Sequence, residues 1–390
     1  MEKKILLVEP DYYTRFPPLG LLKLATYFRN KGCEIELVRG CVDSFVPDEI
    51  YITSLFTYAW KPVHQAVRFY KRKYPKSRVL VGGLYASLLP EHAAKSGADV
   101  IYKGIFEEAE TCIPAWDLVP EWDGSIIFTS RGCIRNCPFC AVPKLEGKLK
   151  TVIGSIKPYV YPLHSRVILW DNNILATNNW ENIFDELEEL NRWVDFNQGL
   201  DARLINEKVA SRLAKLRIKY IRLAYDNKRQ IGKLKNAIEC LANAGIRRKS
   251  IIVYTLYNFR DDPEDFKDRV TQLLNLGVVS YPMRFEPLTS LKKNSFVSKK
   301  WSIEELEMVA KARRVLGFAG AFPPYEGLVK KFSKAKDFYE AFSLRKPKIT
   351  QSKKKIKMCE MGRWFRLEKS GMFSKIMKYG VFSPTTYNSR

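Results

Sequence analysis

Histidine and long apolar runs are both scarce in this sequence, and each shortage excludes a class of function. The 390 residues include only three histidines, His64, His92 and His164, which lie far apart. None has the spacing of a zinc site or a histidine-based catalytic site. No stretch approaches the roughly 20 apolar residues of a membrane-spanning helix. The short apolar run at the start is followed by acid, unlike a signal peptide. We therefore expect a cytoplasmic protein that has no membrane partner.

A disulfide framework is also missing. Eight cysteines are spread from Cys33 to Cys359 without a repeating pattern. This is typical of a reducing compartment, where thiols stay free to bind metal. The apolar content of 46% is ordinary for a globular protein with a sizeable core. A chain of this length has room for two domains and a tail.

Three cysteines nevertheless lie within eight residues: Cys133, Cys137 and Cys140 are spaced C-x3-C-x2-C. Three thiolates at this spacing favour an iron–sulfur cluster, one iron of which would stay open to another ligand. A structural zinc site needs four ligands, commonly in two separated pairs, and no second Cys/His pair exists here. A disulfide between two of the three, or chance clustering, is an alternative reading.

The first 110 residues alternate short apolar strands with helical stretches. Strands are predicted at 5–8, 34–38, 50–55, 78–81 and 99–102, and helices from about 18 to 31, from 63 to 74 and after Pro90. This pattern predicts an α/β domain with a parallel sheet covered on both faces. Ligands of such sheets bind at the carboxyl ends of the strands. Residues 111–123 form a junction in which Trp116 and Trp122 should pack against other elements.

Residues 124–330 contain a second strand–helix series. Strands are predicted at 125–129, 166–170, 195–199, 220–225, 250–254 and 280–285, with helices at 180–192, 206–216, 233–244 and 263–276. The cysteine loop follows the first of these strands. Polar residues follow the next three: Asp171 and Asn172, then Gln198, Asp201 and Arg203, then Asp226 and Asn227. Strand ends of this kind carry binding groups.

Each of these polar groups has a plainer reading beside the functional one. Asp171 and Asn172 could bind an amino group, or they could start an Asx turn. Arg203 is suited to a bidentate contact with a carboxylate, but it could instead pair with Asp201 in the same loop.

The stretch Arg131-Gly132-Cys133-Ile134-Arg135-Asn136-Cys137-Pro138-Phe139-Cys140 resembles the C-x3-C-x-aromatic-C signature of the radical S-adenosylmethionine (SAM) superfamily. The resemblance implies that the three cysteines hold a [4Fe-4S] cluster, that SAM chelates the fourth iron, and that Phe139 lies beside the adenine. It also implies a partial (β/α)6 barrel over residues 124–330, an electron donor of the flavodoxin or ferredoxin type, and reductive cleavage of SAM to a 5′-deoxyadenosyl radical. The polar strand-end residues would contact SAM or the substrate. Asn172 and Ala224 depart from the usual acid and glycine of relatives.

The N-terminal half resembles the Rossmann-like cobalamin-binding domain of B12-type members. The matching stretches are Pro17-Pro18-Leu19-Gly20-Leu21, Thr53-Ser54-Leu55, Gly82-Gly83-Leu84-Tyr85-Ala86-Ser87, Leu89-Pro90-Glu91 and Gly97-Ala98-Asp99. The D-x-H-x-x-G motif is absent, which excludes ligation by its histidine but not cobalamin binding. The resemblance implies cobalamin contacts from Thr53, Ser54, Gly82 and Gly83. The two glycines fit a close approach of backbone to ligand, and fit a plain turn equally well.

Basic charge is concentrated at the end of the chain. The net charge is +24, and residues 345–390 contribute thirteen Lys/Arg against two Glu, interleaved with aromatics. Residues 331–390 therefore read as a helical extension followed by a tail that could bind nucleic acid; a solvated basic surface is the alternative.

The two resemblances imply a radical SAM enzyme that transfers a methyl group to an unactivated carbon if cobalamin is bound. One alternative is radical modification of a nucleic acid or peptide without cobalamin. The other is a nucleic-acid-binding protein with a structural or redox-sensing cluster, but such a cluster has no need of polar groups around the strand ends.

Overall fold

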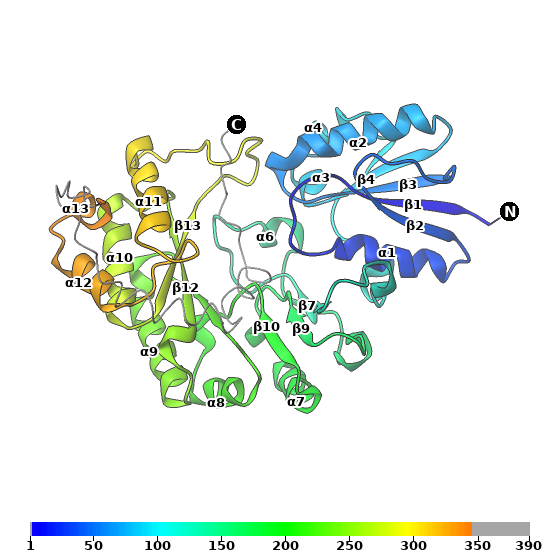
Figure 1. The fold of residues 1–390 in the computed structure, drawn as a ribbon. Coiled ribbons are helices and arrows are strands. Elements are labelled where there is room, and N and C mark those ends of the chain that lie inside the picture. Colours follow the sequence, from blue (N-terminus) through cyan, green and yellow to red (C-terminus); the bar gives the residue numbers. More distant parts are fainter. Residues whose placement is uncertain (1, 345–390) are drawn as a thin grey trace, which may run out of the picture.

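The structure is a computed structural model that describes residues 2–344, and it consists of two α/β halves (Figure 1). The N-terminal half is built on a five-stranded parallel sheet in the order β2-β1-β3-β4-β5. The strands are β1 (Lys4–Glu9), β2 (Glu34–Arg39), β3 (Glu49–Ser54), β4 (Arg78–Gly83) and β5 (Val100–Ile101), and the helices are α1 (Leu19–Arg29), α2 (Trp60–Lys73), α3 (Leu84–Leu88) and α4 (Pro90–Ala94). All five predicted strands occur, so the predicted parallel α/β sheet is confirmed.

Both faces of this sheet are covered because its strands bury alternate side chains on each side. Ile5 and Leu7 of β1 pack with α1, and Leu6 and Val8 pack in the cluster that contains α2. Figure 1 shows α1 and α2 on opposite sides of the sheet. A strand buried on both faces needs a continuous apolar run, which residues 5–8 supply.

The junction between the halves is packed, as its tryptophans predicted. Trp116 is only 2% exposed, and it lies in a cluster with Leu19 and Leu22 of α1 and with Ile126 and Ile168 of the second half. In α5 (Glu107–Glu110), Glu110 pairs with Lys23 of α1 and with Arg131 beside the cysteine loop. The face of the first sheet that α1 covers is therefore turned toward the second half.

Six parallel strands of the second half form two three-stranded sheets. The orders are β6-β9-β10 and β11-β12-β13. The strands are β6 (Ser125–Ile127), β9 (Arg166–Leu169), β10 (Trp193–Phe196), β11 (Ile221–Ala224), β12 (Ile251–Tyr257) and β13 (Val279–Arg284), and the helices between them are α7 (Trp180–Leu190), α8 (Glu207–Lys215), α9 (Ile231–Asn243) and α10 (Pro263–Asn275). Backbone contacts link the sheets, including Leu200 N–H to the Arg222 carbonyl at 2.8 Å. The parallel series is confirmed, while a continuous partial barrel stays a prediction.

The predicted strand bounds differ most from the structure at the third and fifth strands of the second half. The third strand was placed at 195–199, but β10 begins at Trp193, opposite Arg166 of β9, and ends at Phe196 before a turn in which Gly199 has φ +86°. The fifth was ended at Tyr254, but β12 continues to Tyr257 because β13 pairs with it along that length. A short antiparallel pair, β7 (Ser130–Arg131) and β8 (Lys150–Thr151), was not predicted and holds the base of the cysteine loop, which also contains α6 (Val142–Leu145).

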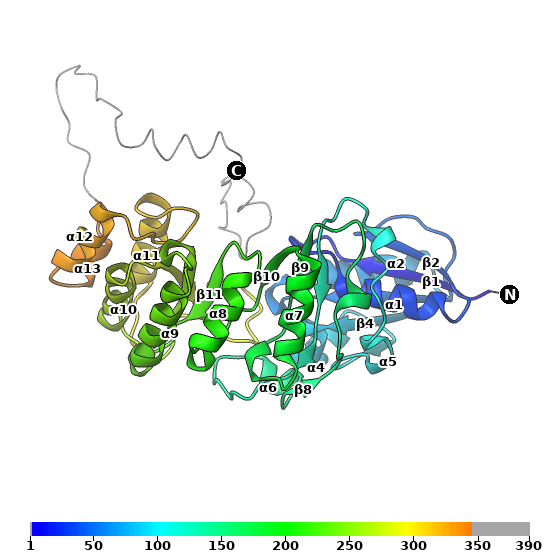
Figure 2. The same cartoon turned by 90° about the horizontal axis from the view of Figure 1, so that it is seen from below.

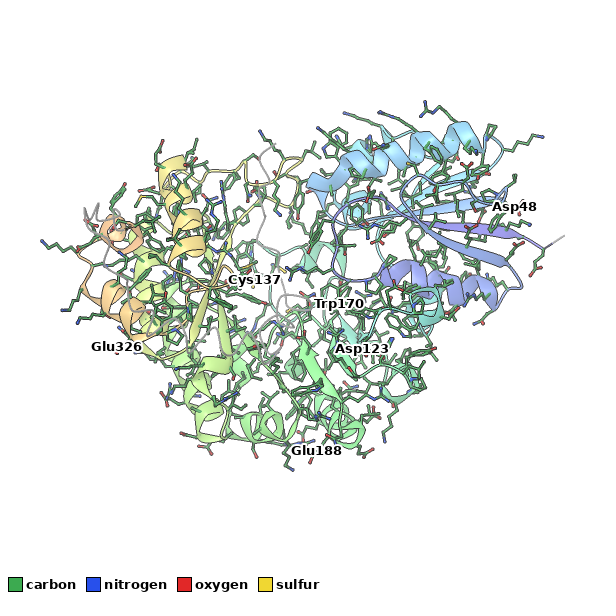
Figure 3. All side chains as sticks on the ribbon, viewed as in Figure 1. Asp48, Asp123, Cys137, Trp170, Glu188 and Glu326 are labelled. Atoms are coloured by element: carbon green, nitrogen blue, oxygen red, sulfur yellow. The ribbon has the colours of Figure 1, made fainter. Side chains whose placement is uncertain are left out.

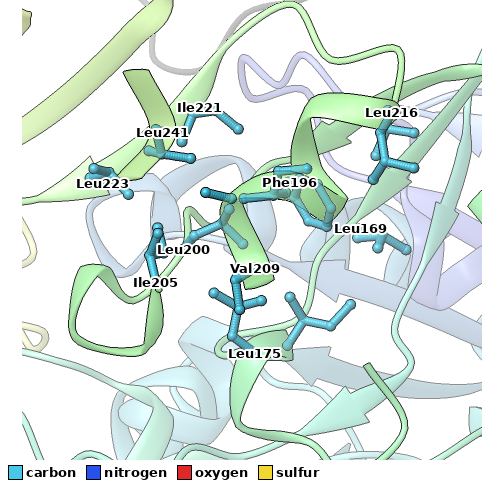
Figure 4. Packing of buried hydrophobic residues seen from close by; sticks show 14 of the residues in the cluster. Leu169, Leu175, Phe196, Leu200, Ile205, Val209, Leu216, Ile221, Leu223 and Leu241 are labelled. Carbon is cyan, nitrogen blue, oxygen red and sulfur yellow. The ribbon is translucent and has the colours of Figure 1, made fainter. Parts of the chain in front are cut away.

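One apolar core spans the two sheets of the second half. Figure 4 shows Phe196 of β10 and Leu169 of β9 on one side of this core, Leu223 of β11 and Leu241 of α9 on the other, and Val209 of α8 between them. Figure 2 shows α7, α8 and α9 side by side along one flank of this half.

Three further helices follow the last strand: α11 (Ile303–Val315), α12 (Glu326–Lys334) and α13 (Phe338–Phe342). They pack on α10 through buried aromatics that include Phe266, Phe332 and Phe342. The predicted helical start of the extension therefore exists, although it is broken between Lys334 and Phe338. The basic tail at 345–390 lies outside the described residues. None of the helices in residues 2–344 is long and apolar enough to cross a membrane.

Candidate functional site

The cysteine loop follows β6 and lies between the two halves; Figure 3 labels Cys137 in this loop and Trp170, which directly follows β9. Its entry is tight: Gly132 has φ +75°, and a Cβ there would lie 2.1 Å from the Lys148 carbonyl oxygen. A backbone hydrogen bond from Cys140 to Cys137 at 3.0 Å closes a turn between the last two thiols. All three loop cysteines are free and partly buried, so the disulfide alternative is not realised in the structure.

Asp171 ties this loop to the end of β9. Its carboxylate is 3% exposed and accepts hydrogen bonds from the backbone N–H and the hydroxyl of both Thr129 and Ser130, at 2.6 to 3.2 Å. Burial raises the pKa of Asp171, and the four hydrogen bonds oppose that rise by favouring the charged form. Asp171 therefore orients Thr129 and Ser130, which directly precede the cysteine loop. This role differs from both the amino-group contact and the Asx turn considered from the sequence.

Asn173, the residue directly after the predicted pair Asp171 and Asn172, also belongs to the site. It is buried, and its side-chain amide donates to Asp201 at 3.3 Å and lies 3.7 Å from the sulfur of Cys133. Its Oδ1 is buried without a hydrogen-bond partner among the described residues. Because buried amide oxygens are rarely left unpaired, this atom is a candidate acceptor for a ligand donor. The neighbouring Asn172 instead donates to Glu146 at 2.8 Å.

Two arginines converge on Asp201. The guanidinium of Arg203 donates to it at 2.6 Å and that of Arg135, from the cysteine loop, at 2.9 Å. Burial alone would raise the pKa of Asp201, but the hydrogen bonds from Arg203 and Arg135 outweigh it and lower the pKa. The ion pair considered for Arg203 thus exists, and it extends to the cysteine loop.

Asp226 adds a carboxylate near the thiols. Burial raises its pKa to about 6, although Arg269 and Arg203 oppose the rise. Burial also raises the pKa of the Cys137 thiol, and the nearby Asp226 and Cys140 raise it further. These mutual effects mean that the structure brings Asp226, Arg203 and the cysteines together, as their strand-end positions predicted.

Phe139, Asn227 and Gln198 are the remaining predicted residues of this region. Phe139 packs edge-on against Phe259, with ring centroids 5.7 Å apart. Asn227 accepts from the backbone N–H of Arg229 and caps a short turn, and Gln198 is exposed.

The donor set of the loop fits an iron–sulfur cluster by its chemistry. Three free thiols are available, and the sulfur of Cys133 already accepts from the backbone N–H of Arg135 at 3.3 Å. Thiolate ligands and N–H donors to sulfur are what such clusters use. Among residues 2–344, however, no three His, Cys, Asp or Glu side chains are arranged to hold a metal ion. The cluster therefore stays a prediction that rests on donor chemistry.

At the carboxyl edge of the N-terminal sheet, Ser54 and Gly83 meet. The Ser54 hydroxyl donates to the Gly82 carbonyl at 2.6 Å and accepts from the Ala86 N–H at 3.1 Å. Gly83 has φ +97°, and a Cβ there would lie 2.2 Å from the Ser54 carbonyl oxygen. Glycine is thus required at 83 by the neighbouring strand. A ligand approach is not needed to explain it.

Two ionisable residues at this edge were not predicted. Glu9, at the end of β1, is 8% exposed, and burial raises its pKa to about 7, with Arg39 opposing. Tyr12 is buried beside it and hydrogen-bonds with Thr53. No pattern in the sequence marks either residue, because their burial depends on loops that are distant in the chain.

No protein-family model matches the chain, and no curated protein sequence matches it. Its fold, in contrast, is shared with a solved radical SAM enzyme. The radical S-adenosylmethionine methyltransferase TsrM from Kitasatospora setae, with cobalamin and a [4Fe-4S] cluster bound, superposes with a TM-score of 0.58 at 13% identity, covering 80% of this chain and 76% of that one.

A second structure of TsrM, with tryptophan substrate and the SAM analogue aza-SAM, gives a TM-score of 0.56 at 13% identity, covering 79% and 77% of the two chains. Coproporphyrinogen III oxidase (HemN) from Escherichia coli aligns over 53% of this chain and 57% of its own, at 13% identity and a TM-score of 0.36. The two TsrM structures therefore confirm the resemblance to a cobalamin-binding radical SAM methyltransferase at the level of the fold.

Proposed function

We propose that this protein is a radical SAM enzyme whose [4Fe-4S] cluster is held by Cys133, Cys137 and Cys140. The observation that carries the proposal is the placement of three free thiols in one loop, anchored by Asp171, within a fold shared with a radical SAM methyltransferase. When bound and reduced, the cluster supplies the electron that splits SAM into methionine and a 5′-deoxyadenosyl radical.

Residues around the loop can bind the methionine end of SAM, which presents one amino group and one carboxylate. The unpaired Oδ1 of Asn173 can accept from the amino group. Arg203 can turn one guanidinium edge to the carboxylate while Asp201 stays paired with Arg135. Phe139 would lie beside the adenine. These contacts would orient SAM beside the thiols.

The proposed reaction is methyl transfer to an unactivated carbon, with cobalamin bound at the carboxyl edge of the N-terminal sheet near Thr53, Ser54, Gly82 and Gly83. Support comes from the TsrM structure, whose bound groups include cobalamin. The electron donor would be an acidic flavodoxin- or ferredoxin-like protein, for which the net charge of +24 is complementary. Reduced thiols of this kind suit the cytoplasm.

Anaerobic reconstitution with iron, sulfide and hydroxocobalamin, followed by desalting and metal and corrinoid counts, tests the proposal. The wild-type protein should retain about four irons per chain, as a [4Fe-4S] cluster requires. Cys137→Ala should retain less than half of that iron. Cys240→Ala, which removes a free cysteine on α9, is the matched control and should behave as wild type. Equal iron in all three proteins would refute the proposed ligands.

A second candidate is radical chemistry without cobalamin, acting on a nucleic acid or a peptide. Gly83 favours this candidate, because the neighbouring Ser54 backbone already explains why glycine is needed at this position. No bound cobalamin is required to explain it. The same reconstitution separates the two: a retained corrinoid supports methyl transfer, and four irons without corrinoid support the second candidate.

A further inference from the structure

A groove outside the cysteine loop runs along the outer side of α2. It has a volume of about 740 Å³ and is lined by Trp60, Lys61, His64, Gln65, Arg68, Lys71 and Arg72 of α2 and by Ser96 and Gly97. The helix covers the face of the N-terminal sheet opposite α1 (Figure 1). None of the residues that line the groove belongs to the candidate SAM site, so the groove is a separate site.

The charge of this groove is positive and largely unpaired. Helix α2 carries five Lys/Arg and no acidic residue. Lys61, Arg68 and Arg72 are exposed and form no ion pair with any described residue, whereas Lys71 pairs with Asp99 at 2.6 Å. A merely solvated helix face usually mixes charges of both signs.

The three unpaired cations form a row. Their spacing of seven and then four residues places them on one side of the helix. Residues 61 and 72 are separated by eleven helical steps, or about 16 Å along the axis. A single phosphate could reach only one or two of these cations, so the row fits an extended polyanion better.

The inner wall of the groove is aromatic and neutral. His64 Nε2 hydrogen-bonds with the Tyr85 hydroxyl at 2.8 Å, and that hydroxyl contacts His92 Nδ1 at 2.6 Å. Trp60 packs edge-on against both imidazoles, with centroids 5.0 Å apart. Burial, the nearby His92 and Arg68 lower the pKa of His64 to about 4, so the wall offers a fixed ring system and the cations stay on the rim.

We propose that this groove binds the backbone of a single-stranded nucleic acid. Lys61, Arg68 and Arg72 contact successive phosphates, and Trp60 offers a ring for stacking by a base. Cations with an adjacent aromatic ring in a recess match the way proteins bind single strands. This site goes beyond the proposed function and depends neither on a cluster nor on residues 345–390.

Fluorescence anisotropy of the full chain with labelled single-stranded RNA and DNA, over a range of salt concentrations, tests the site. The variant K61A/R68A/R72A removes the row. The control variant K233A/K235A/K249A removes three other exposed lysines without ion pairs in the described part of the chain, and it lowers the net charge equally. All residues changed are exposed, and circular dichroism checks that each variant folds.

The row variant should bind at least tenfold more weakly than wild type, with a log–log salt slope smaller by about 2, since each lost phosphate contact removes about 0.7. The control should stay within about twofold of wild type. Equal loss in both variants, or no loss in either, overturns the site. Binding of the same proteins to phosphatidylserine vesicles is measured alongside. The site is also overturned if the row variant loses binding to these vesicles but not to RNA or DNA, because the groove would then contact a membrane surface.

Discussion

Asp171 shows how much one buried carboxylate can organise. It accepts four hydrogen bonds from two consecutive residues, Thr129 and Ser130, which lie 42 and 41 positions earlier in the chain. The sequence located this aspartate at a strand end but could not show its partners, because long-range contacts leave no local pattern. The same holds for the unpaired oxygen of Asn173, whose isolation appears only once the surrounding loops are folded.

Asp171→Asn should lower the free energy of unfolding by about 3 kcal/mol, since an amide group replaces an acceptor that serves four donors. Urea denaturation measures this loss. The control Asn172→Ala removes only the hydrogen bond to Glu146 and should cost about 1 kcal/mol. Equal losses in the two variants would mean that Asp171 does not anchor the loop.

Gly83 offers a second test on one residue. Gly83→Ala would place a methyl group 2.2 Å from the Ser54 carbonyl oxygen at φ +97°, and should cost about 3 kcal/mol. Gly97→Ala has a similar φ of +90° but open space around the new methyl group, and should cost about 1 kcal/mol. Both variants share the cost of the positive φ. The difference between their midpoints of thermal unfolding therefore measures only the steric clash between the new methyl group and the Ser54 carbonyl oxygen. A zero difference would show that β3 and β4 are not held this closely.

At the scale of elements, α10 is fixed by a buried arginine. Arg269 is fully buried; it pairs with Asp261 at 2.7 Å and Asp265 at 2.6 Å and donates to the carbonyls of Tyr225 and Leu256. It thereby joins the helix to the ends of β11 and β12 and holds the backbone next to Asp226. The helix was predicted over residues 263–276, but this connection was not.

Arg269→Ala should lower the free energy of unfolding by about 3 to 5 kcal/mol, because two carboxylates lose their partner in a buried setting. Chemical denaturation gives the value. Lys311→Ala, which breaks an exposed pair with Glu307, should cost less than about 1 kcal/mol. A loss below that level for Arg269→Ala would show that this pairing does not stabilise the fold.

The packing of α2 on α3 and α4 should respond to acid through His64. Its folded pKa of about 4 lies below the ordinary histidine pKa of 6.5. The unfolded chain therefore binds more protons between these values, and stability falls as the pH drops through that window. Between pH 7 and pH 5 this one group should cost about 2 kcal/mol.

The stability that Glu9 contributes depends on pH in the opposite direction. Its pKa is raised from 4.5 to about 7, so its contribution to stability is present at low pH and is lost as the pH rises.

The comparison of wild type with His64→Gln isolates the contribution of the histidine. The variant should lose about 2 kcal/mol less stability than wild type on moving from pH 7 to pH 5, measured by urea titration. The same loss in both proteins would contradict a buried neutral His64.

For the whole molecule, local pattern was enough to predict the two parallel strand–helix series and the position of the cysteine loop, because burial on both faces and a C-x3-C-x2-C spacing are both visible in short segments. The split into two sheets between β10 and β11 was not visible, since it depends on the turn at Gly199 and on pairing across the chain. The row of cations on α2 was predictable from the sequence, because no acidic residue occurs between Trp60 and Lys73.

The central claim is that the cysteine loop supports reductive cleavage of SAM. The direct measurement is the amount of 5′-deoxyadenosine that the full-length protein forms from SAM. The protein is first reconstituted anaerobically with iron and sulfide and then reduced by dithionite. We expect product from the wild-type protein and from Cys240→Ala, and only background from the variant with Cys133, Cys137 and Cys140 all changed to alanine. A wild-type protein that carries its full iron and yet forms no 5′-deoxyadenosine would contradict the account.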